Sequence, residues 1–190
     1  MVMVMNSFEF AISPKGVDKK GQATVPAICR CIANAVKRSV DDEKGGMMMS
    51  RSAFVIDERP KTGDLINILV SKPLNKNVST LNNIVTLTDS EGEEIGHGTI
   101  EWSKAQEHQN GPDYENMGNS TVRFIYKFFD LLPGDFTSGG LQTGIEVRCH
   151  RPVKKDDVLT YKIRRARDDR YVFQALSGGE TVFRAALLTA

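Results

Sequence analysis

The stretch Thr24–Val40, TVPAICRCIANAVKRSV, decides the fold. Its apolar residues recur at steps of three and four, the period of one helix face, and three alanines stand between them. A helix that is apolar almost all round is usually buried, so we expect this one to lie in the core. Thr24 is a good N-cap, and Pro26 fits a first turn, where its missing N–H would have no partner. We therefore predict one long helix here, with strands arranged around it.

Five strand candidates accompany this helix. One precedes it, where apolar and polar residues alternate over Asn6–Ile12. The charged, glycine-containing stretch Asp41–Ser52 is expected to be a loop. The other four candidates follow in close succession: Ala53–Glu58, Asp64–Ser71, Val78–Thr88 and Glu94–Trp102. One strand, one helix and four more strands predict a compact first unit over residues 1–105.

The second part of the chain repeats this order in a shorter form. Residues 106–118 are polar and rich in Asn, Gly and Pro, which is typical of a linker. A second helix is predicted over Asn119–Leu132, with Asn119 or Ser120 as its N-cap. Four strand candidates follow it: Gly144–His150, Val158–Arg165, Tyr171–Ser177 and Thr181–Thr189. This predicts a second unit over residues 119–190 that has no evident first strand.

A short motif supports an internal repeat. The pattern R-P-x-x-x-D begins at Arg59 and returns 92 residues later at Arg151, so that it pairs Asp64 with Asp156. Both copies open a strand, and both units later reach a tight turn that ends in Gly-Glu. Either the chain contains a duplicated unit, or the motif is a common turn into a strand and the rest is ordinary alternation.

Composition and charge exclude several classes of protein. A net charge of +1 over 190 residues gives no broad nucleic-acid or membrane-surface footprint. Two of the three cysteines stand two positions apart on the predicted helix and so point away from each other, which predicts reduced thiols and no metal site. No apolar run approaches the ~20 residues of a membrane span, and the first residues lack the pattern of a secretory signal. We expect a cytoplasmic protein without a bound metal or cofactor.

One helix after one strand, then a run of antiparallel strands, resembles the hot-dog superfamily of acyl-thioester enzymes. The first half looks most like the small thioesterases and the amino-terminal half of acyl-carrier-protein thioesterases, through Ile12-Ser-Pro-Lys-Gly-Val-Asp18-Lys-Lys-Gly21-Gln22-Ala-Thr24. Many of those enzymes have G-H-V-N-N where this chain has Gly21-Gln-Ala-Thr-Val25. The resemblance implies an α+β hot-dog fold, an antiparallel sheet wrapped around a central helix. Two such units would form a double hot-dog.

The resemblance also implies an activity. It points to an acyl thioesterase that hydrolyses thioesters of coenzyme A or acyl carrier protein. Asp18 is the candidate base or nucleophile, and Gln22 and His97 are further candidates for catalysis. Each has a plainer interpretation: Asp18 as a solvated turn residue, Gln22 as a neutral loop residue and His97 as a surface strand residue. A hydratase or dehydratase of the same fold and a non-catalytic acyl-binding module remain alternatives, and two double hot-dogs could pair as a homodimer.

Substrate contacts are expected at the two helix starts. A helix N-terminus can polarise a thioester carbonyl with its free N–H groups, which makes Thr24 and Val25, and Asn119 and Ser120, candidate substrate-binding residues. Basic residues of the last third, among them Lys154 and Lys155, could meet the phosphates of coenzyme A or the acidic face of a carrier protein. The same basic residues could instead protect an edge strand from aggregation.

Overall fold

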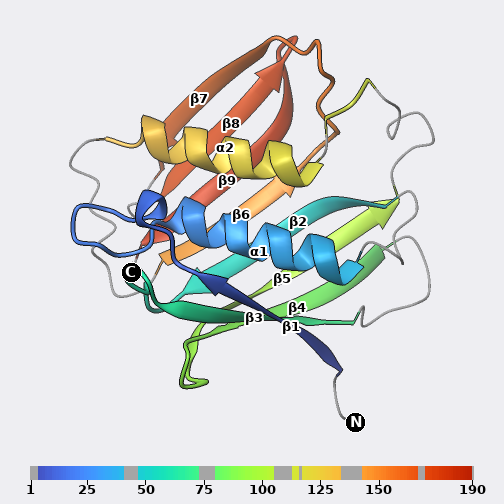
Figure 1. Cartoon of the computed structure of the whole chain (residues 1–190). Helices are drawn as coiled ribbons and strands as arrows, with labels where there is room; N and C mark the ends of the chain where they lie inside the picture. Colours follow the sequence, from blue (N-terminus) through green and yellow to red (C-terminus); the bar gives the residue numbers. More distant parts are fainter. Residues whose placement is uncertain are drawn as a thin grey trace.

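Within the part of the chain that the structure describes, nine antiparallel strands form one sheet in the order β1-β3-β4-β5-β2-β6-β9-β8-β7, and two helices lie side by side on one of its faces (Figure 1). The computed structural model describes residues 4–40, 47–72, 80–104, 113–115, 117–133, 143–166 and 170–189. The elements are β1 (Met5–Ala11), a 3-10 turn (Pro14–Gly16), α1 (Val25–Val40), β2 (Met47–Ile56), β3 (Leu65–Ser71), β4 (Thr80–Thr88), β5 (Glu94–Lys104), α2 (Met117–Leu131), β6 (Thr143–Cys149), β7 (Leu159–Arg165), β8 (Tyr171–Ser177) and β9 (Glu180–Thr189).

The structure confirms the long helix predicted over Thr24–Val40, which is α1, with one correction. Its apolar face is buried, with Val25, Ile28 and Ile32 at no more than 2% exposure. It is not apolar all round, because the exposed residues Arg30 and Asn34, and Lys37 with Arg38 beyond them, form a polar stripe along the opposite face. The helix is therefore amphipathic and lies on the sheet, and a second helix shares that face with it.

Strand β2 corrects the predicted loop before it. The strand begins at Met47, so residues 47–52, expected in a connection, are strand, while residues 41–46 lie outside the described residues. A run of three methionines carries no alternating signal, and a register shift between Met49 and Arg51 breaks the alternation further. The length of β2 matters because it pairs with β5 on one side and β6 on the other.

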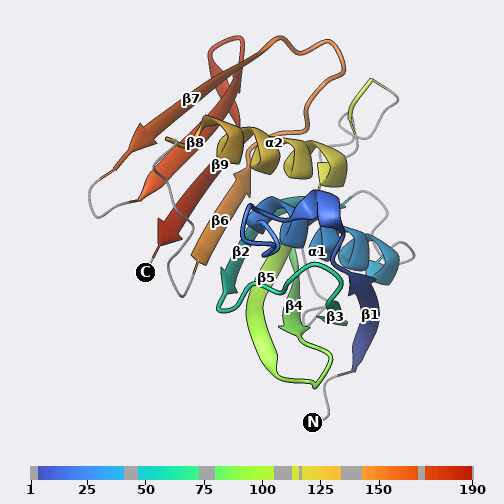
Figure 2. The ribbon, with the colours of Figure 1, turned by 60° about the vertical axis from the view of Figure 1, so that its left-hand side comes forward.

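The β2–β6 pair forms the seam between two halves that have the same connectivity. In each half a helix is followed by four strands, and the order β3-β4-β5-β2 on one side of the seam mirrors β6-β9-β8-β7 on the other. The two helices run in opposite directions (Figures 1 and 2). Arg30 of α1 lies over the ring of Tyr126 of α2, with its guanidinium carbon 4.7 Å from the ring centroid.

The repeated motif is present as structure but shifted by one residue. The N–H of Lys61 donates to Asp64 at 2.7 Å, and the N–H of Lys154 donates to Asp157 at 2.8 Å. The matched aspartate is therefore Asp157 and not Asp156, because the second copy has one extra residue, Val153, between the proline and the lysine that opens the turn. Both pairs lie 93 residues apart (61 to 154 and 64 to 157).

The start of α2 also differs from the prediction. The helix begins at Met117, so Asn119 and Ser120 lie inside its first turn and neither is the N-cap. Of the predicted linker, residues 106–112 and 116 lie outside the described residues, and residues 117–118 are helical. Tyr114 forms a β-bridge with Lys154, and the N–H of Glu115 donates to the carbonyl of Val153 at 2.8 Å.

Candidate functional site

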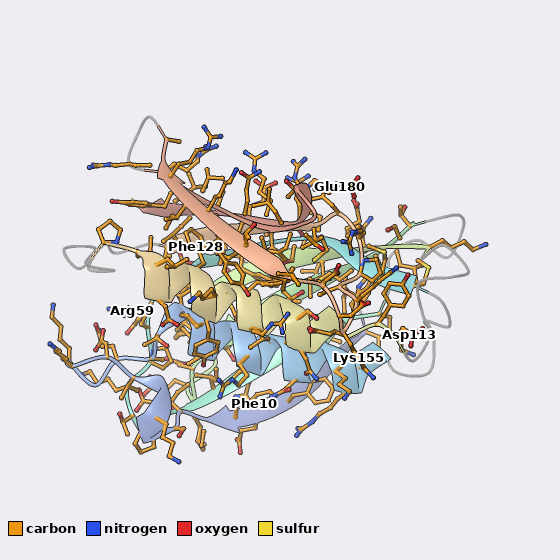
Figure 3. All side chains as sticks on the ribbon, turned by 90° about the horizontal axis from the view of Figure 1, so that it is seen from above. Phe10, Arg59, Asp113, Phe128, Lys155 and Glu180 are labelled. Carbon is orange, nitrogen blue, oxygen red and sulfur yellow. The ribbon has the colours of Figure 1, made fainter. Side chains whose placement is uncertain are left out.

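The two helix starts lie at opposite ends of the helical face. Figure 3 places Arg59 beside the start of α1 at one end, and Asp113 and Lys155 beside the start of α2 at the other. This separation follows from the antiparallel helices. The predicted site residues therefore fall into two groups that cannot share one substrate carbonyl.

Thr24 caps α1 as predicted. Its carbonyl accepts the N–H of Ile28 at 3.1 Å, and its hydroxyl oxygen accepts the N–H of Ala27 at 3.4 Å. Pro26 has no N–H, which leaves the N–H of Val25 as the donor of this turn that has no partner among the described residues. Val25 is buried at 1% exposure, so water is kept from its N–H and a carbonyl would have to displace covering atoms to reach it. In such an environment a single donor polarises a carbonyl more strongly than it would in water.

Asp18 lies just before this helix start, and protein groups occupy both of its carboxylate oxygens. Oδ1 accepts the N–H groups of Lys20 at 2.8 Å and Gln22 at 3.1 Å, and Oδ2 accepts from Arg59 at 3.0 Å. Burial raises the pKa of Asp18, but the hydrogen bonds from Gln22, Lys20 and Arg59 outweigh it, and the pKa lies below its usual value. Asp18 is therefore a carboxylate that stays ionised at neutral pH and is a weak base.

Arg59 connects Asp18 to Gln22. Its side chain is 11% exposed, and its second terminal nitrogen donates to Oε1 of Gln22 at 2.9 Å. Because Arg59 fixes the oxygen end of this amide, the Nε2 group of Gln22 is the end left to donate to a ligand. The structure thus brings Asp18, Gln22, Thr24 and Val25 together around one helix start.

His97 does not join this group. It lies on β5 and is 53% exposed, whereas Ile100 on the same strand is buried at 3% on the helical face. Nδ1 of His97 lies 2.8 Å from Oε1 of Glu94 and 3.8 Å from Oδ2 of Asp57, and all three side chains are exposed. His97 is therefore a surface strand residue, which is the plainer of the two interpretations given for it.

The start of α2 is built around Glu115. Its carboxylate accepts the hydroxyl of Ser120 at 2.9 Å and pairs with Arg123 at 3.0 Å. Lys154 and Lys155 are exposed beside it, and the N–H of Lys155 donates to the carbonyl of Asp113 at 2.8 Å. The second group of predicted residues is thus also brought together, with Glu115 as an organiser of the first turn.

An ion pair in the second half joins the partly exposed Arg151 to Asp157, and the sequence predicts only the turn that carries it. Asp157 has a side-chain exposure of 9% and accepts from Arg151 at 2.9 and 3.2 Å and from Ser177 at 2.5 Å. The hydrogen bonds from Arg151 lower the pKa of Asp157 most, and burial acts in the opposite direction. Hydrogen bonds from Ser177 and Lys154 lower it further, so that the pKa of Asp157 lies far below its usual value. The motif R-P predicts the turn, but Ser177 lies 20 residues further on and no local pattern links it to Asp157.

The strand order and the two helices on one face of the sheet place the chain in one structural class. It has a hot-dog-like fold with a large antiparallel sheet and two helices, as the sequence resemblance implied. Solved structures share this fold along nearly their whole length. The chain is similar to an acyl-ACP thioesterase from Bacteroides thetaiotaomicron, with a TM-score of 0.78, 15% identity and 98% of both chains covered. It is also similar to a 12:0-ACP thioesterase from Umbellularia californica, with a TM-score of 0.73, 12% identity, and 98% of this chain and 97% of that chain covered.

A third similar structure carries a different name. HtdX of Mycobacterium tuberculosis matches with a TM-score of 0.70 and 10% identity, and covers 98% of this chain and 100% of that one. No family model matches the sequence, and no curated protein matches it. At these identities the similarity establishes the fold. No helix among the described residues is both long and apolar enough to cross a membrane.

Proposed function

We propose that the chain binds acyl thioesters of coenzyme A or acyl carrier protein and hydrolyses them. The observation that carries this proposal is the shared fold: the chain is similar to an acyl-ACP thioesterase with a TM-score of 0.78 over 98% of each chain. The fold supplies two helix starts, and a helix start is a place where a thioester carbonyl can be polarised.

We place the reaction at the start of α1. The thioester carbonyl would accept hydrogen bonds from the N–H of Val25 and from Nε2 of Gln22, which Arg59 orients. Water would attack the carbonyl carbon, the C–S bond would break, and the proton released by the water would leave with the thiolate as a thiol. Hydrogen-bond donors aimed at the developing oxyanion are usually the largest single contribution to such a reaction.

Two roles are open to Asp18 in this scheme. As a base it would take the proton from the attacking water, and its ionised state at neutral pH supports that role. As an anchor it would hold Arg59 and therefore Gln22 in place, and its occupied oxygens and low pKa support this second role. Arg59→Gln separates the two roles, because it removes the partner of the anchor and leaves the carboxylate in place. Turnover lost as strongly in Arg59→Gln as in Asp18→Asn would support the anchor, and turnover lost chiefly in Asp18→Asn would support the base.

A non-catalytic acyl-binding module is the second candidate function. The observation in its favour is that both oxygens of Asp18 are already used by Lys20, Gln22 and Arg59. A hydratase or dehydratase would need a histidine and an acid in one pocket. His97 has Asp57 and Glu94 beside it, but on the outer face of the sheet.

We further propose that the two halves are copies of one duplicated unit, divided as the sequence predicts. The mirrored strand order and the matched turns at Lys61 and Lys154 support this proposal. A homodimer, a cytoplasmic location, and substrate contacts by Lys154, Lys155, Asn119 and Ser120 stay predictions.

The test is thiol release from a panel of acyl-carrier-protein and acyl-coenzyme A substrates. We expect turnover by the wild type, a loss of at least about tenfold in Gln22→Ala, since one oxyanion donor contributes at this scale or above, and no change in His97→Ala, the matched surface control. Turnover that survives Gln22→Ala would move the reaction to the start of α2. Absence of turnover on every substrate, together with measurable binding of an acyl thioester, would establish the binding module.

A further inference from the structure

The sheet has an open end at β7. Within the described residues β7 pairs only with β8, whereas β3, which holds the corresponding place in the first half, pairs with both β4 and β1. An edge strand presents a row of N–H and C=O groups that an extended peptide can pair with. The first half therefore shows what occupies this position when it is filled.

In the first half, β1 completes the core. Ile66, Ile68 and Val70 of β3 face the helices and are each 0% exposed. Phe8 and Phe10 of β1 stand opposite Ile68 and Ile66 in the antiparallel register and pack against the same core. Alternating apolar residues on the added strand are thus what buries this face.

In the second half, the corresponding face is only partly covered. Residues 93 positions later, Leu159, Tyr161 and Ile163, face the helices from β7 and pack against the core but are only partly buried. Lys127 of α2 lies over the ring of Tyr161, with its Nζ 5.6 Å from the ring centroid. The open backbone edge and the incompletely buried apolar row therefore belong to the same strand.

Charge restricts what can occupy this edge. Lys162 and Arg164 alternate with the apolar row and are exposed on the other face of β7. If two copies of the chain paired β7 with β7, these cations would lie close to those of the other copy, and like charges across strands are destabilising. The same cations that disfavour a second copy of β7 favour a strand that carries carboxylates beside them.

We propose that β7 accepts an extended segment of a partner protein as an added antiparallel strand. The segment takes the place that β1 takes against β3. It carries apolar side chains toward Leu159, Tyr161 and Ile163, and alternating acidic side chains toward Lys162 and Arg164. Main-chain hydrogen bonds supply affinity in this mode of recognition, and the alternate side chains supply specificity. The inference does not depend on thioester hydrolysis.

The probe is a synthetic peptide with the sequence of Val4–Ile12 of this chain and the changes Met5→Glu and Ser7→Glu, and in both peptides Asn6→Val places an apolar side chain opposite Ile163. In the register of β1 on β3, Met5 and Ser7 stand opposite Ser71 and Leu69. The residues 93 positions after these are Arg164 and Lys162, so the two glutamates would meet the two cations. A second peptide with Met5→Lys and Ser7→Lys is the charge-inverted control.

Fluorescence anisotropy of the labelled peptides against the whole protein gives the first result. We expect the acidic peptide to bind the wild type. Its affinity for the Lys162→Glu/Arg164→Glu variant should be lower by at least about tenfold, because close charge pairs contribute at this scale. The basic peptide should bind that variant instead. Arg184→Glu, on β9 in the interior of the sheet, is the matched control and should leave binding unchanged. Circular dichroism confirms that each variant is folded.

Hydrogen exchange gives the second result. The bound acidic peptide should slow exchange of β7 amides and leave those of β1 unchanged. Protection elsewhere, binding that is indifferent to the charge reversal, or no binding by either peptide would overturn the proposal. So would self-association in sedimentation together with slowed exchange of β7 amides in the absence of any peptide, because a second copy would then be the occupant.

Discussion

The interaction energy between Asp18 and Arg59 can be measured directly, and it tests whether Arg59 organises the start of α1. In Asp18→Asn, one side-chain oxygen can still accept from the loop N–H groups, but the other is replaced by an NH₂ that faces the guanidinium of Arg59. The lost contact is a charge-assisted hydrogen bond of 3.0 Å between side chains that are 28% and 11% exposed. Such a bond contributes about 1.5–3 kcal/mol when buried, and we expect about 1–2 kcal/mol at this partial exposure.

The assay is chemical denaturation of four proteins: wild type, Asp18→Asn, Arg59→Gln and the double variant. If the side chains act as a pair, the double variant will be about as stable as Arg59→Gln alone, with a coupling energy of about 1–2 kcal/mol. For a chain of this length each kcal/mol lowers Tm by about 2–4 °C. Additive losses, with a coupling energy near zero, would refute the argument that Arg59 holds Asp18 and Gln22 in one arrangement.

The pH dependence of the same pair has a definite sign. The folded-state pKa of Asp18 is lowered, so its contribution is fully present above the unfolded-state pKa of about 3.9 and is lost as pH falls through the folded-state pKa. The stability difference between wild type and Asp18→Asn should therefore be constant around neutral pH and shrink below about pH 4.

Three further substitutions test the rest of the fold. Asp157→Asn should lower the free energy of unfolding at neutral pH by about 2–4 kcal/mol, because it leaves the half-buried Arg151 without its carboxylate, and the loss should fade in acid, since the pKa of Asp157 is also lowered. Gly98→Ala should cost about 3 kcal/mol or more in denaturant melts, because its Cβ would clash with the ring of Phe54, whereas Gly144→Ala, whose Cβ would have no neighbour closer than 3.4 Å, should stay within about 1 kcal/mol.

Local patterns predicted the elements whose signals are local. Thr24 marks the start of α1, and the alternating residues of β3 and β7 mark strands, because both signals depend on neighbouring positions. The start of α2 was placed two residues late, because Asn119 and Ser120 are good caps by residue type although neither caps the helix. The burial of β7 was not predictable, since the same alternation describes a strand with or without a neighbour.

The candidate site was predicted only in part, for a related reason. Asp18 and Gln22 are close in sequence, and the resemblance placed them at the helix start. Arg59, which joins them, lies 41 residues from Asp18, and its role depends on how β2 and β3 bring it back to α1. The glycine neighbours of His97 make it a candidate, but they say nothing about which face of the sheet it occupies.

The seam between β2 and β6 has a consequence for how this protein can change over time. In a symmetric pair of identical chains, each substitution appears in both copies of a site. Here the two helix starts are formed by different stretches of one chain, Thr24-Val25-Pro26 in one half and Met117-Gly118-Asn119 in the other. Joined in a single sheet, they are inherited together but mutate independently, so one end of the molecule can keep a chemistry while the other acquires a different role.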